Sequence, residues 1–129
     1  MVDVAAPRRI LELMFLTAWA DGRLEGSEAI AIHKIAAHYP LLRGVGATEE
    51  IDVQARRRLE RLGLDVCVRE AAEAIVDPAH RELAFQCCAK VSGSDGVYLP
   101  QEAQVLQLLR KVWGFSPEQV ERLLVLATR

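Results

Sequence analysis

A nine-residue stretch that occurs twice constrains the fold of this chain more than any other feature. The first copy spans residues 20–28 and the second spans residues 94–102. Each copy contains an Asp-Gly pair, a large apolar residue two positions after the Gly, and a Glu seven positions after the Asp. Internal similarity at a fixed spacing is typical of a duplicated structural unit, so we expect two related halves.

The segments around the two copies are also alike. Residues 10–20 contain only one charged side chain, Glu12, and residues 78–92 are the second very apolar segment. A helix that is apolar nearly all round is a buried helix, so we expect both segments in the core. A shift of 74 positions superimposes them and places Ile32 on Leu106 and Tyr39 on Trp113. The pattern predicts two helix-loop-helix units.

The whole chain divides into seven expected helices, because apolar residues recur at helical spacing and no segment alternates like a strand. Expected N-caps are Thr48, Asp65, Asp77 and Ser116, and residues 41–47 are expected to form a loop. The helices are expected at about residues 7–20, 27–38, 49–62, 65–76, 78–92, 100–113 and from 117 onward. With no linker in between, residues 1–129 are predicted to form one all-α domain.

Composition restricts the compartment and the class of partner. The net charge is −2, whereas a nucleic-acid-binding domain is usually basic. No apolar run is long enough to cross a membrane, and the N-terminal residues do not have the pattern of a secretory signal. The cysteines are Cys67, Cys87 and Cys88, an odd number that is typical of reduced, buried thiols. We therefore expect a cytoplasmic protein that does not bind nucleic acid and has no transmembrane segment.

The repeated acids suggest a site for a divalent metal ion, since Ca²⁺, Mg²⁺ and Mn²⁺ prefer carboxylate oxygens. Asp21 and Glu28 fit positions five and twelve of an EF-hand loop, and Asp95 and Glu102 fit the same frame. A standard EF-hand is nevertheless excluded, because its first and third positions would lack carboxylates in both loops. The alternative stays open that these acids only end or cap helices.

The duplicated pattern resembles the tellurite-resistance TerB-like family. The resemblance rests on residues 20–24 with Glu28, and on residues 94–98 with Glu102, each after an apolar helix. It implies a single all-helical domain with an internal duplication that covers nearly the whole chain. It also implies divalent-metal binding by Asp21, Glu28, Asp95 and Glu102, and a role in stress response, tellurite resistance or phage defence.

Other side chains favour structural roles. The histidines lack a transition-metal spacing, and Cys87 and Cys88 lie in an apolar helix. The arginines at 56–58 and 61 are expected at a solvated helix end, and Trp19 and Trp113 in the core. The leading hypothesis is a non-enzymatic, metal-responsive module that binds a protein partner. The alternatives are a metal-dependent hydrolase that uses the same four acids, and a metal-free helical scaffold.

Overall fold

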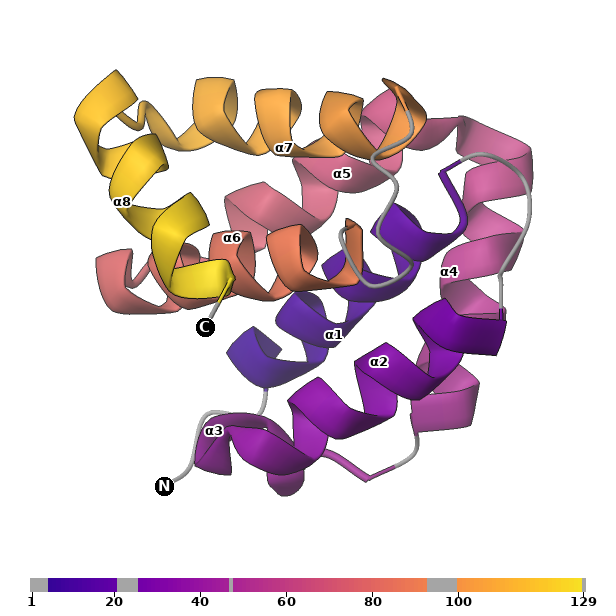
Figure 1. Ribbon diagram of the computed structural model, residues 1–129. Coiled ribbons are helices and arrows are strands. Elements are labelled where there is room, and N and C mark those ends of the chain that lie inside the picture. Colours follow the sequence, from indigo (N-terminus) through magenta and orange to yellow (C-terminus); the bar gives the residue numbers. More distant parts are fainter. Residues whose placement is uncertain (1–4, 21–25, 47, 93–99, 129) are drawn as a thin grey trace.

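The computed structural model describes residues 5–20, 26–46, 48–92 and 100–128 (Figure 1). These residues form eight helices and no strand, which confirms the predicted all-α fold. The helices are α1 (Ala5–Ala18), α2 (Gly26–His38), α3 (Pro40–Arg43), α4 (Thr48–Leu62), α5 (Leu64–Ala74), α6 (Pro78–Ser92), α7 (Pro100–Trp113) and α8 (Pro117–Ala127).

Helix α1 lies at the centre of the fold, with α6 beside it (Figure 1). It packs against α2, α4 and α5 as well, and its side chains Ile10, Leu13 and Leu16 are completely buried. Phe85 of α6 is also buried. The two segments that the sequence marks as most apolar are therefore the two central helices.

The helix bounds agree with the duplicated unit. Shifted by 74 positions, α1 falls on residues 79–92 and α2 on residues 100–112, within one residue of the bounds of α6 and α7. Within each unit the first helix packs against the second, and the two first helices pack against each other. The repeat thus corresponds to two helix pairs that meet through α1 and α6.

Several helix termini form as the sequence predicts. The side chain of Ser116 accepts a hydrogen bond from the backbone N–H of Gln119 at 3.1 Å. Asp77 Oδ1 likewise accepts from the N–H of Ala79 at 2.8 Å. Gly114 follows α7 with φ of 67°, a conformation that costs glycine little. These local signals fix the start of α6 and α8 and the end of α7.

Five predictions of local structure are wrong. Residues 41–43 of the predicted loop belong to α3, because Pro40 suits a first helical turn and Leu42 is buried. Asp65 lies inside α5 and pairs with Arg69 at 3.3 Å, while Gly63 occupies the N-cap position. Thr48 is the first residue of α4 rather than its cap. Helices α1 and α5 also end two residues before the predicted ends.

Across the described ranges, no helix is both long enough and apolar enough to cross a membrane.

Candidate metal centre

Helices α1 and α6 pack together toward their C-terminal ends. Thr17 of α1 lies beside Cys88 of α6, close enough to influence the pKa of its thiol. Thr17 Oγ1 also donates to the carbonyl of Leu13 at 2.8 Å, and Ser92 Oγ donates to the carbonyl of Cys88 at 3.0 Å. Both hydroxyl residues are completely buried. The two helices that precede the acidic loops therefore pack together through buried residues near their C-terminal ends.

Of the four predicted metal ligands, Glu28 is the one whose side chain the structure describes. It lies in the first turn of α2 and is only 2% exposed. Burial of a carboxylate is costly unless hydrogen bonds or a positive charge compensate it, and the N-terminus of a helix supplies part of that compensation. Glu28 is thus held inside the protein, at the start of the helix that follows the first acidic loop.

The side chains of the other three predicted ligands are not among those that the structure describes. Asp21 and Asp95 lie outside the described residues. Glu102 belongs to the first turn of α7, the position in the second unit that corresponds to Glu28, but its side chain is outside the described part. The side chains that are described include no group of three His, Cys, Asp or Glu residues able to hold a metal ion. Convergence of the four carboxylates stays a prediction.

Trp19 lies directly after α1 and is partly buried rather than a full core residue. Its Nε1–H donates to Asp52 Oδ1 at 2.7 Å, and the Arg56 guanidinium lies 5.1 Å from the centre of its ring. These contacts tie the end of α1 to α4. The indole stands two residues before Asp21, which makes its fluorescence a probe of the first acidic loop.

The arginine cluster of α4 is more than the solvated helix end that the sequence predicts. Arg58 forms ion pairs with Glu12 of α1, at 3.2 Å, and with Glu70 of α5. Glu12 also pairs with Arg9 at 2.8 Å, and its side chain is only 12% exposed. Glu12, the single charged residue within the apolar part of α1, is the sequence feature that could have indicated this network, because a nearly buried carboxylate requires a cation. The network was not predicted from the sequence, because the residues that form it lie far apart in the chain.

The three cysteines are buried, as predicted. Burial raises the pKa of the Cys87 thiol, and it raises the pKa of Cys88 to about 12 although the neighbouring Thr17 hydroxyl acts to lower it. Burial also raises the pKa of Cys67. A higher pKa leaves less of the reactive thiolate at neutral pH, so these side chains serve packing.

We expect all three thiols to resist a disulfide reagent in the native protein. At pH 8 the raised pKa values and burial should slow the reaction about a hundredfold or more relative to the protein unfolded in urea. Stopped-flow absorbance with Ellman's reagent measures both rates. A native thiol that reacts as fast as in urea would contradict the packing role.

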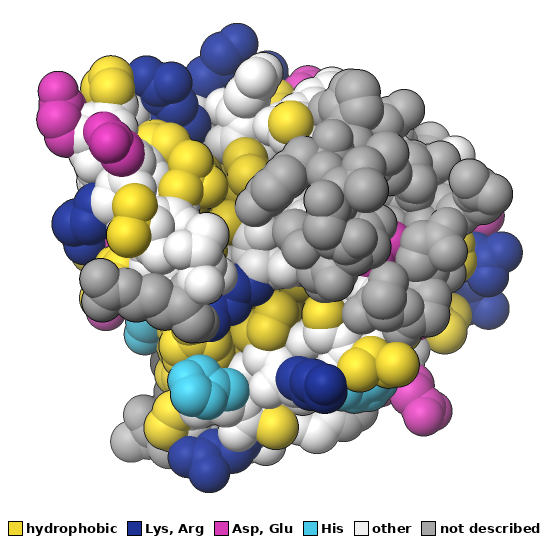
Figure 2. Space-filling view, viewed as in Figure 1, with side chains coloured by type: hydrophobic (Ala, Val, Ile, Leu, Met, Phe, Trp, Pro, Cys, Tyr) yellow, Lys and Arg dark blue, Asp and Glu magenta, His cyan; other side chains and the backbone are white. Residues whose placement is uncertain are grey.

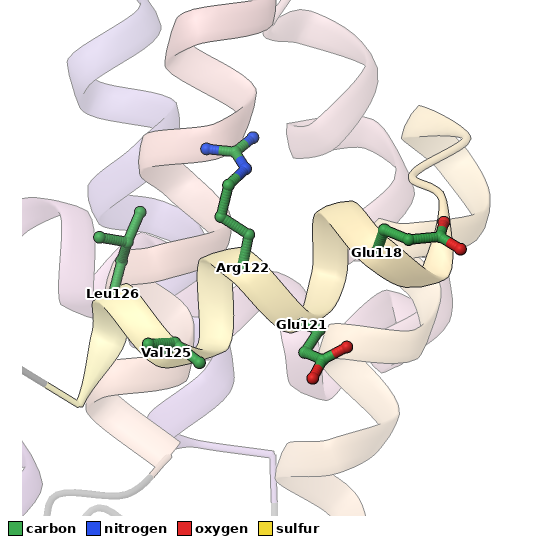
Figure 3. Close-up of a pocket in the computed structure, with 5 residues that line it drawn as sticks. All are labelled: Glu118, Glu121, Arg122, Val125 and Leu126. Carbon is green, nitrogen blue, oxygen red and sulfur yellow. The ribbon is translucent and has the colours of Figure 1, made fainter.

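A shallow pocket of about 370 Å³ on α8 is a poor catalytic site (Figure 3). In the close-up, the side chain of Arg122 points to the opposite side of the helix from that of Glu121, and Glu118 points away from both. The Arg122 guanidinium instead pairs with Glu82 of α6 at 2.6 Å. The polar groups around this pocket diverge and do not surround a substrate.

Comparison with protein-family models, with characterised proteins and with solved structures finds no match.

Proposed function

We propose that this protein is a non-enzymatic, divalent-metal-responsive interaction module of a stress-response, tellurite-resistance or defence system. The observation that carries the proposal is the burial of the Glu28 carboxylate at the start of α2. A bound cation stabilises a buried carboxylate, and carboxylate oxygens suit Ca²⁺, Mg²⁺ or Mn²⁺. The resemblance to the TerB-like family supplies the biological setting.

The packing of the central helices supports a site shared between the two halves. Because α1 and α6 pack together toward their C-terminal ends, we expect the two acidic loops that follow them to start from neighbouring points. In the proposal, Asp21 and Glu28 of the first unit and Asp95 and Glu102 of the second hold the metal. Binding would fix one helix pair relative to the other and so alter the surface offered to a protein partner. Buried, reduced thiols suit a cytoplasmic location.

Isothermal titration calorimetry with Ca²⁺, Mg²⁺, Mn²⁺ and Zn²⁺ tests metal binding. We expect at least one of the first three cations to bind with a Kd below about a millimolar, and Glu28→Gln to weaken that binding by about tenfold or more. Glu118→Gln is the matched control, because Glu118 is likewise an acid in a first helical turn but is exposed. Its affinity should equal that of the wild type.

Two outcomes would contradict the proposal. One is the absence of binding by any cation below millimolar concentration. The other is equal affinity in the wild type and in Glu28→Gln, which would leave the acids as parts of a metal-free scaffold. In that case Asp21→Ala and Asp95→Ala should cost only about 1 kcal/mol of stability each, as lost helix caps do.

A further inference from the structure

A groove of about 450 Å³ runs between α2, α6 and the C-terminal end of α8. Its lining includes Ala31, Lys34 and Ile35 of α2, Ala89 and Lys90 of α6, and Ala127 of α8. Figure 2 shows hydrophobic side chains in this region, between the end of α8 and α2, with cationic side chains beside them. The groove combines an apolar floor with positive charge.

The charge of the groove differs from that of the whole protein. The chain has only three lysines, Lys34, Lys90 and Lys111, and a net charge of −2, yet two of the lysines line this groove and, among the residues that the structure describes, no acidic residue does. The Lys90 ammonium lies 5.7 Å from the centre of the Tyr39 ring, which holds it in place. Neither Lys34 nor Lys90 forms an ion pair with any residue that the structure describes, whereas Arg58 is paired twice.

The shape of the groove favours a helix as the occupant. Ile35 and Ala89 form a nearly buried floor, and the small side chains of Ala31 and Ala127 leave room for another backbone to approach closely. The groove is open to solvent, so it would enclose little of a small molecule, which binding sites usually surround on most sides. An amphipathic helix, in contrast, can lay its apolar face into such an open groove.

We propose that this groove docks an acidic amphipathic helix of a partner protein. The apolar stripe of that helix covers Ile35 and Ala89, and carboxylates on either side of the stripe pair with Lys34 and Lys90. The inference rests on the proposed function in so far as both assign the protein an interaction role. It requires no metal ion, and it names the chemistry of the partner.

A designed peptide tests the proposal with the full-length protein. The probe is a fluorescein-labelled, 18-residue helical peptide with a Leu/Ala stripe flanked by glutamates, and its control replaces every glutamate with lysine. We expect the acidic peptide to bind in fluorescence anisotropy and the basic one not to bind. Lys34→Glu/Lys90→Glu should weaken binding about tenfold or more, and Lys111→Glu, a lysine outside the groove, less than about twofold.

Amide chemical shifts in ¹⁵N-labelled protein then locate the peptide, with the largest changes expected at residues 31–35 and 89–90. The proposal is overturned if the acidic peptide does not bind at millimolar concentration, or if the Lys111 variant loses as much affinity as the double variant. Self-association of the wild type that the double variant lacks would also overturn it, by assigning the groove to a second copy. Peptide binding that survives in Glu28→Gln separates this inference from the metal proposal.

Discussion

Replacing Trp113 with alanine is expected to lower the free energy of unfolding by about 3–5 kcal/mol, as large-to-small changes in a core do. Trp113 is the last residue of α7 and is only 9% exposed. Its ring centre lies 5.6 Å from that of Phe115, which in turn lies 5.6 Å from that of Phe85 in α6. Loss of the indole therefore opens a cavity where α6 and α7 meet.

Trp113→Phe separates the contribution of packing from that of hydrogen bonding. The Trp113 Nε1–H donates to the carbonyl of Ala72 in α5 at 2.9 Å, and phenylalanine cannot make this bond. We expect a loss of about 1–2 kcal/mol for Trp113→Phe in urea unfolding followed by circular dichroism. The control is Tyr39→Ala, at the corresponding position of the first unit, where the ring is only partly buried. Equal losses for Tyr39→Ala and Trp113→Ala would contradict this account.

Replacing Arg58 with alanine is expected to cost about 2 kcal/mol, between the values for exposed and for fully buried ion pairs. The Arg58 side chain links Glu12 of α1 to Glu70 of α5, and Glu12 is nearly buried. The substitution removes one of the two arginines that compensate Glu12 and leaves Arg9 as the other. The cost therefore comes mainly from a carboxylate that is poorly solvated.

The neighbouring Arg57 provides the control for Arg58. It is exposed on the same helix, so Arg57→Ala should change the free energy of unfolding by less than about 0.5 kcal/mol. Adding Glu12→Gln to Arg58→Ala should recover part of the loss, because an amide needs no cation. Equal stability of the two arginine variants would show that Arg58 is an ordinary solvated side chain.

The sequence predicts the elements of this fold well where local chemistry decides them. Ser116 and Asp77 cap helices as expected, and Pro78, Pro100 and Pro117 each open a helix. The prediction fails at residues 41–43, where burial of Leu42 stabilises a short helix that local spacing does not reveal. Local signals in the sequence therefore predict where the longer helices form, whereas tertiary packing decides whether a short segment becomes helical.

The sequence predicted which residues could form the candidate site, but not how they are arranged in space. The repeat identifies Asp21, Glu28, Asp95 and Glu102, but the burial of Glu28 depends on how α2 packs onto its neighbours. The proximity of α1 and α6 through Thr17 and Cys88 depends on contacts between residues 71 positions apart. A single sequence does not indicate which residues so far apart come into contact. The packing of the two halves therefore could not be predicted from it.

Native mass spectrometry with Ca²⁺, Mg²⁺ or Mn²⁺ tests the central claim, that the two acidic loops share a metal, most directly. The wild type should retain bound metal, and Asp21→Asn and Asp95→Asn, one in each unit, should each lose the same ion. The fluorescence of Trp19 should change on metal addition in the wild type alone. Loss of separate ions by the two variants, or the same metal content in both variants and the wild type, would contradict the claim.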